Sequence, residues 1–137
     1  MTRAAGRAVR AIATHPGAAW TWRALLVLLL VAVSYLALAP KPPAGVDTGW
    51  DKLNHVLAFT ALALCASLGY PASRRTRQAL LGGLLAYGGA IELLQLSVPS
   101  RSAEWSDLLA DSIGIGAGAI VATLVLRLAT LQTARSP

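Results

Sequence analysis

Hydrophobic residues gather into four long apolar stretches, separated by short polar segments. The stretches cover residues 22–40, 52–70, about 76–98 and about 107–130. Each is close to the roughly 20 mostly apolar residues that a helix needs to cross the hydrocarbon of a bilayer. A helix also satisfies its own backbone hydrogen bonds in lipid. The pattern therefore predicts an all-α membrane protein, built as a bundle of four transmembrane helices.

The limits of these stretches also predict the domain organisation. We expect a basic cytoplasmic N-terminal tail over 1–22, a four-helix transmembrane domain over 23–130 with its core motifs at 48–122, and a short C-terminal tail over 131–137. The first stretch has an alternative interpretation as a signal peptide, because a basic leader precedes it and Ala-Leu-Ala stands at 37–39. Pro40 is unfavourable after a cleavage site and the leader is long, so we favour an uncleaved helix.

Charge is scarce and unevenly distributed. Only 13% of the 137 residues are charged and 55% are hydrophobic, whereas a soluble domain has about 25% charged residues. The net charge of +6 does not indicate a nucleic-acid partner, because its distribution follows membrane topology. All Lys and Arg residues except Lys41, Lys52 and Arg101 fall on one predicted side of the membrane. That side is expected to be the cytoplasm, with both termini on it.

The acidic residues show the opposite preference. All six fall toward the predicted outer face: Asp47, Asp51, Glu92, Glu104, Asp107 and Asp111. At a rise of about 1.5 Å per residue, His55 and Asp111 lie about 6 Å inside the start of their helices, and Glu92 about 10 Å inside the end of its helix. Ionisable side chains at such depth are costly and indicate a functional site. We therefore predict a polar layer just beneath the outer surface.

Helical spacing places members of this layer on shared faces. Asp51 and His55 are four residues apart, so they stack on one side of the second helix. His55 alone would be satisfied by bonding Asp51. The catalytic candidates are His55, Glu92 and Asp107. The ligand-binding candidates are Asp51, Lys52, His55, Glu92, Gln95, Arg101, Asp107 and Asp111.

Several of these residues have a structural alternative. Asp51 and Asp107 open helices, where a carboxylate can cap free amides and favour the helix dipole. Lys52 is expected to extend to the lipid headgroups, and Arg101 is a counter-ion for the acids. Glu92 has the strongest claim to a functional role, since the pattern places it in mid-helix among apolar neighbours, without a local capping role.

Small and aromatic residues complete the pattern. Gly88, Gly114 and Gly118, together with the glycine pairs at 82–83 and 88–89, predict faces on which helices approach closely. The lone Cys65 is expected to be a small buried hydrophobe. Tryptophans at the predicted span ends are typical interface anchors: Trp20, Trp22, Trp50 and Trp105.

Three motifs in order, DKLNHVLAF, IELLQLSVPSR and DLLADSIGIGAG, resemble the VanZ-like family of small membrane proteins. The family pattern is Asp-Lys-x-x-His with an aromatic four residues later, here Phe59, then Glu-x-x-Gln with a Pro-x-Arg loop, then Asp-Leu-x-x-(Asn/Asp). Asp111 stands where asparagine is more usual. The resemblance covers residues 48–122. It implies four spans, a multi-pass protein of the bacterial cytoplasmic membrane, and a link to resistance to teicoplanin, a lipid-tailed glycopeptide acting at the outer face.

Three functions remain open. In the first, which we favour, the polar layer binds an envelope lipid, a headgroup or a lipidated glycopeptide without catalysis. In the second, an intramembrane enzyme acts on a lipid-linked envelope precursor, with His55 as acid/base, positioned by Asp51 or Glu92, and Arg101 receiving phosphate or carboxylate. In the third, the layer fixes helix register and the glycines form a homo-oligomer.

A metal-assisted version of the enzyme would bind a hard divalent ion through His55, Glu92 and Asp107 or Asp111. The sequence has no HExxH motif or Cys/His metal spacing, and no serine or cysteine in a recognisable nucleophile setting. A non-catalytic role is therefore favoured. No cofactor is predicted, and a divalent cation is left open for the enzyme alternative.

Overall fold

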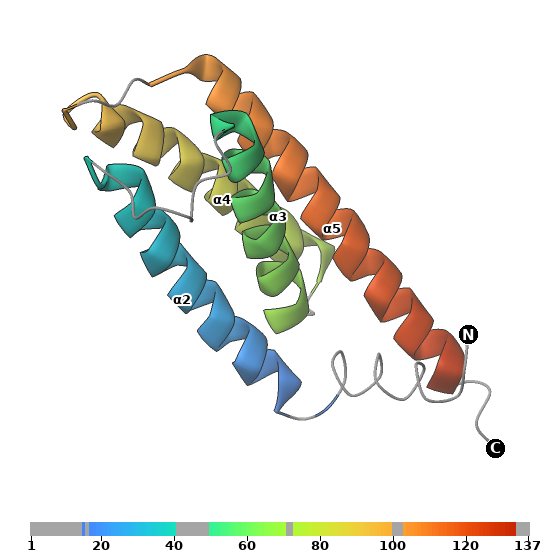
Figure 1. Cartoon of the computed structure of the whole chain (residues 1–137). Coiled ribbons are helices and arrows are strands. Elements are labelled where there is room, and N and C mark those ends of the chain that lie inside the picture. The colour runs from blue at the N-terminus through green and yellow to red at the C-terminus, as the bar shows by residue number, and fades with distance from the viewer. Residues whose placement is uncertain (1–14, 16, 41–49, 71–72, 100–102, 134–137) are drawn as a thin grey trace.

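A computed structural model describes residues 15, 17–40, 50–70, 73–99 and 103–133. Every regular element within these ranges is an α-helix: α2 (Ala18–Leu38), α3 (Asp51–Gly69), α4 (Arg74–Gln95) and α5 (Trp105–Thr133). Successive helices run in opposite directions, so α2 and α4 finish at the end of the bundle where α3 and α5 begin (Figure 1). The all-helical fold predicted from the apolar pattern is confirmed.

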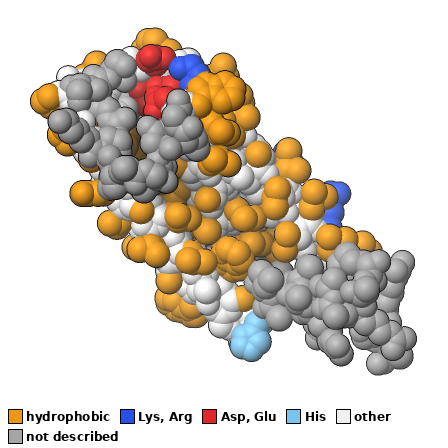
Figure 2. Space-filling model, viewed as in Figure 1, with side chains coloured by type: hydrophobic (Ala, Val, Ile, Leu, Met, Phe, Trp, Pro, Cys, Tyr) orange, Lys and Arg blue, Asp and Glu red, His pale blue; other side chains and the backbone are white. Residues whose placement is uncertain are grey.

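The two ends of the bundle differ in charge. We call the end where α3 and α5 begin the acidic end, because it carries Asp51, Glu92, Glu104, Asp107 and Asp111. The opposite end is the basic end, with Arg23, Arg74, Arg75, Arg77 and Arg127. Hydrophobic side chains cover most of the visible surface between them (Figure 2).

Three helices are long and apolar enough to cross a membrane. They are α2, α3 and residues 105–131 of α5, with mean hydropathies of 2.0, 1.3 and 1.9. Helix α4, which covers most of the predicted third span, does not reach this level because arginines fill its first turn and Glu92 and Gln95 its last. A membrane-type protein is therefore supported by three helices, and a fourth crossing stays a prediction.

Three helix ends differ from the expected limits by three residues or more. Helix α5 runs to Thr133, into the predicted C-terminal tail. Helix α2 begins at Ala18, within the predicted N-terminal tail, because alanines and Thr21 continue the helical run back to Gly17. Helix α4 ends at Gln95, before the predicted limit at residue 98. The following residues form turns that precede Pro99, and a proline disfavours helical geometry in the residue before it.

Helix α3 is the centre of the bundle and packs most extensively against α5, then against α2. Phe59, Leu62 and Ala63 are at most 2% exposed, and all of residues 62–69 except Leu64 are buried. Since lipid is as apolar as leucine, association of helices in a bilayer depends on van der Waals contact between well-fitting surfaces. The small residues of α3 provide that fit.

Glycines permit the close approach of α3 and α5. A Cβ on Gly114 would lie 3.0 Å from the Phe59 Cβ, and a Cβ on Gly118 would lie 2.9 Å from the Ala63 Cβ. By contrast, a Cβ on Gly82, Gly83 or Gly116 would meet nothing within 4 Å among the described residues. The 82–83 pair therefore forms no packing face within the described chain, because these glycines face outward, and a role between chains stays a prediction.

Hydrogen bonds connect α4 to α2. The Tyr87 hydroxyl donates to the Leu30 carbonyl at 3.1 Å and lies 2.8 Å from the Ser34 Oγ. Gln95 Nε2 donates to the Ala37 carbonyl at 3.0 Å, near the end of α2. The last carbonyls of a helix lack intrahelical partners, so Gln95 satisfies a group that would otherwise be costly in lipid.

Three of the four tryptophans lie exposed at helix ends, as interface anchors do. Trp20, Trp50 and Trp105 are 70%, 66% and 89% exposed. Trp22 instead packs against the buried core. Cys65 is buried, as expected for a small hydrophobe.

Candidate functional site

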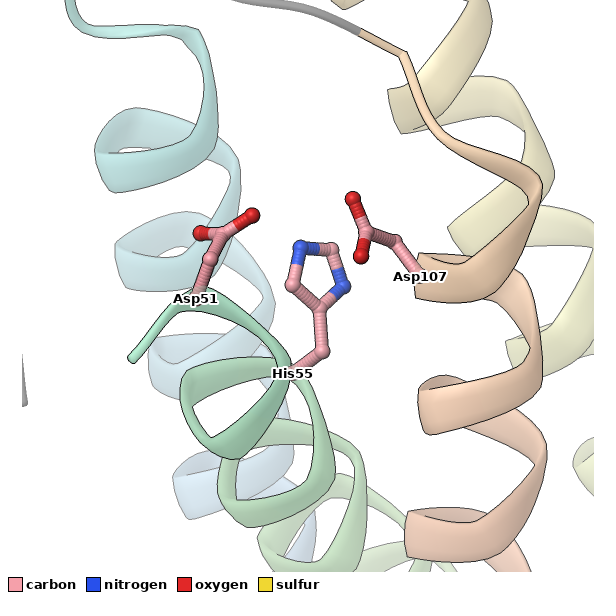
Figure 3. A group of neighbouring side chains, drawn as sticks. All are labelled: Asp51, His55 and Asp107. Carbon is pink, nitrogen blue, oxygen red and sulfur yellow. The ribbon is translucent and has the colours of Figure 1, made fainter. Parts of the chain in front are cut away.

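His55 is the centre of the acidic end. It lies one turn into α3, and its Nδ1 is 2.8 Å from Asp111 Oδ1 on α5. Its Nε2 lies 4.0 Å from Glu92 Oε1 on α4. Figure 3 shows the imidazole ring between Asp51 and Asp107. One histidine therefore faces carboxylates from three helices.

Asp51, His55 and Asp107 form the closest group. Each offers a ligand atom, and these atoms lie within 4.8 Å of one another. Asp51 is the first residue of α3 and is exposed, whereas Asp107 is only 2% exposed. The group therefore extends from an exposed residue into the protein.

Lys52 joins α3 to the start of α5. Its Nζ donates to Glu104 Oε2 at 2.8 Å and lies 3.4 Å from Asp107 Oδ1. Lys52 therefore pairs with two carboxylates, and its expected contact with the lipid headgroups stays a prediction. The Lys52 hydrogen bond, with a weaker one from Ser106, lowers the pKa of Glu104 below its ordinary value, so Glu104 is ionised at neutral pH.

Glu92 has a structural contact that the sequence pattern did not indicate. Because α4 ends at Gln95, Glu92 lies in the last turn and not in mid-helix. Its Oε2 accepts a hydrogen bond from the Glu104 backbone N–H at 3.1 Å, just before α5 begins. Glu92 therefore fixes the entry to α5 with one oxygen and presents the other toward His55.

Two buried carboxylate oxygens have no hydrogen-bond partner among the described residues: Glu92 Oε1 and Asp111 Oδ2. Asp111 is fully buried, and its Oδ2 lies where a Cβ on Gly88 would be. Gly88 thus makes room on α4 for an acid that belongs to α5. Buried polar atoms are normally paired, and each exception calls for an explanation.

The remaining predicted residues divide into two groups. Gln95 is buried but bonds α2, so it lies apart from the carboxylates. Arg101 and Asp47 lie outside the described residues, so their predicted places in the layer stay predictions.

The described site carries an excess of negative charge. Five carboxylates face only Lys52 and His55, so a bound cation would lower their mutual repulsion. The His55–Asp111 pair also resembles the arrangement by which a carboxylate orients an imidazole for acid–base chemistry. The site is suited to binding a cationic group and carries one group able to transfer a proton.

An apolar groove of about 440 Å³ runs beside this site, between α4 and α5. Its walls include Ala86, Ala90 and Leu93 of α4 and Leu108 of α5. Glu92 and Glu104 also line it, so the groove ends at the acidic cluster. No sequence signal marked this groove, because it depends on which flank of α4 the other helices leave uncovered.

One comparison with known proteins found a match. The family model described as VanZ/LLP1 matches residues 19–127, which include all four helices for most of their length. Searches of curated proteins and of solved structures found no match.

Proposed function

This chain belongs to the VanZ/LLP1 family, and we propose that it is a four-span protein of the bacterial cytoplasmic membrane that binds a lipid-tailed ligand of the cell envelope. The tail occupies the groove between α4 and α5, and the polar headgroup meets the acidic end. A lipoglycopeptide such as teicoplanin is one ligand of this chemistry. The binding itself involves no reaction.

The distribution of charge supports the orientation in the membrane that we propose for this protein. Arginines gather at the basic end, and positively charged segments remain in the cytoplasm. The path of the chain supports a membrane crossing by α4. Helix α3 ends at the basic end and α5 begins at the acidic end, so α4 returns the chain from one end to the other (Figure 1). The acidic end then faces the outer leaflet, with both termini in the cytoplasm.

The observation that carries the proposal is the junction between groove and acidic cluster. Glu92 and Glu104 line the groove and also take part in the contacts of the cluster. An amphiphile has the same division, with an apolar chain joined to a polar head. A volume of about 440 Å³ is within the usual range for small-molecule sites. The excess of carboxylates favours a headgroup that carries an amine.

One observation favours the enzyme as a second candidate. His55 is fixed by Asp111 at 2.8 Å and lies near the groove end, where it could move a proton to or from a bound headgroup. Turnover of a lipid-linked envelope precursor by the purified protein, abolished in His55→Gln, would favour this candidate over simple binding.

The proposal is tested by substitutions that fill the groove with a larger side chain. Ala90→Phe places a ring in the groove, whereas Ala79→Phe adds the same ring to the same face of α4, outside the groove. Native mass spectrometry of purified protein should detect teicoplanin or a co-purified lipid on wild type and Ala79→Phe. Ala90→Phe should lose at least tenfold in bound fraction.

Growth of a teicoplanin-sensitive Gram-positive host gives the cellular readout. At matched membrane abundance, wild type and Ala79→Phe should protect against the drug, and Ala90→Phe and Glu92→Gln should not. If Ala90→Phe binds and protects like wild type, the groove is not the site. If wild type and Ala79→Phe retain a lipid but neither protects against the drug, the ligand is an envelope lipid other than the drug.

A further inference from the structure

We propose that the acidic end also binds one divalent metal ion, Mn²⁺ or Zn²⁺, through Asp51, His55 and Asp107, with Glu92 as a fourth ligand. This inference goes beyond lipid binding and does not depend on it. It rests on three observations: the spacing of the ligand atoms, the orientation of His55, and a buried oxygen without a partner.

The spacing is close to that of a metal site. Bonds of about 2.0–2.2 Å from zinc to nitrogen or oxygen place the ligand atoms roughly 3–4 Å apart. Ligand atoms of Asp51, His55 and Asp107 lie within 4.8 Å of one another. In Figure 3 the carboxylates stand on either side of the imidazole. A metal would have to draw these atoms about 1 Å closer together.

The orientation of His55 is that of a metal ligand with an outer carboxylate. When Nδ1–H donates to Asp111 Oδ1 at 2.8 Å, the other ring nitrogen, Nε2, carries a lone pair. Histidines bound to metals usually donate their second N–H to a carboxylate or carbonyl, which fixes the tautomer. Asp111 is then a positioning residue, and Nε2 is the coordinating atom.

Glu92 supplies the independent observation. Glu92 belongs to α4 and not to the group of three, the residue as a whole is 8% exposed, and its Oε1 has no hydrogen-bond partner among the described residues. That oxygen lies 4.0 Å from His55 Nε2. A lone pair and a carboxylate facing each other inside a protein repel, and a cation between them removes the repulsion.

The ligand types select the metal class. One imidazole with carboxylates suits Zn²⁺ or Mn²⁺, whereas Mg²⁺ and Ca²⁺ favour oxygen alone. Lys52 approaches Asp107 at Oδ1, 3.4 Å away, so the second oxygen of that carboxylate serves the metal. Because Lys52 also pairs with Glu104 at 2.8 Å, it keeps a partner when the metal binds.

The experiment uses the full-length protein in lipid nanodiscs, treated with a chelator and titrated with Mn²⁺, Zn²⁺ or Mg²⁺ by isothermal calorimetry. Wild type should bind one Mn²⁺ or Zn²⁺ per chain and bind Mg²⁺ at least tenfold more weakly. His55→Gln and Asp51→Asn should each weaken binding at least tenfold. Asp51→Asn changes an exposed residue and keeps its size, so its folding, checked by circular dichroism, is expected to be normal.

A matched control separates the role of His55 from that of histidine in general. His15→Gln removes the other histidine of the chain, which lies outside the acidic end, and should bind like wild type. The proposal is overturned if wild type binds neither metal more tightly than Mg²⁺, if Asp51→Asn and His55→Gln bind normally, or if ¹⁵N resonances show a doubly protonated His55 that no metal displaces at neutral pH.

Discussion

At the basic end, Arg23 donates from Nε to the Gly69 carbonyl at 2.8 Å, and its guanidinium lies over the rings of Tyr70 and Trp20 at 4.5 and 5.1 Å. At the acidic end, Glu92 and Asp111 each keep one buried oxygen without a described partner. The first charge caps a helix C-terminus, where the dipole favours a cation. The second arrangement costs stability and persists in the fold. The cation at the basic end is thus satisfied within the described chain, whereas two oxygens at the acidic end lie where we propose that a ligand binds.

The largest expected effect comes from separating α3 from α5 beside the acidic end. Gly114→Leu would force the new side chain against the backbone of α3, so we expect a loss of about 3 kcal/mol in stability and dispersal of the acidic cluster. Thermal unfolding in detergent measures this loss of stability. Gly116→Leu, two residues away and outward-facing, should melt like wild type. If the two variants melt at the same temperature, the close approach of α3 and α5 is not what holds the acidic end together.

A smaller loss should follow at the basic end. Arg23→Ala removes the hydrogen bond to Gly69 and the contacts with two aromatic rings, so we expect a cost of about 1–2 kcal/mol. Ligand and metal binding at the other end should be unchanged. Arg127→Ala, an exposed arginine of the same end, is the control and should alter melting little. A loss of metal binding in Arg23→Ala would contradict the proposal that the basic end serves stability and the acidic end serves binding.

Glu92→Gln should lose binding and keep its stability, whereas Arg23→Ala should lose stability and keep binding. Glutamine keeps the oxygen that accepts from the Glu104 N–H and removes one charge from a carboxylate-rich site. Stability should therefore change by less than about 1 kcal/mol, while metal affinity falls. Thermal unfolding measures the stability and calorimetry measures the metal affinity, both on the same sample. A variant that binds normally but unfolds much earlier would assign Glu92 to structure.

The smallest effect concerns the exposed Lys52–Glu104 pair. Because Lys52 lowers the pKa of Glu104 in the folded protein, the pair stabilises at neutral pH, and this contribution disappears as pH falls through the folded pKa of Glu104. The melting difference between wild type and Glu104→Gln should be slight at neutral pH and vanish once the pH falls below the folded pKa of Glu104. A difference that grows on acidification would show that another group is responsible.

Much of the acidic end was predictable because helical spacing and membrane depth convert residue numbers into positions. The intervals of four between Asp51 and His55, and between Asp107 and Asp111, sufficed to bring these side chains to one level. The contact of Glu92 with the Glu104 backbone was not predictable, since it depends on the turn that ends α4 early. The outward direction of Gly82 and Gly83 was equally hidden, because spacing identifies a face but not its partner.

The length of α5 has a consequence for the choice of membrane. Asp107 and Arg127 are separated by about 30 Å along the helix axis, which is also the thickness of a typical hydrocarbon layer. If Arg127 stays at one interface, the bilayer thickness decides how far Asp107 and its neighbours lie from the other. A thicker bilayer draws the carboxylates into hydrocarbon, and a thinner one leaves them in water. In a bilayer, lipid chain length is therefore expected to set how far the acidic end lies from water.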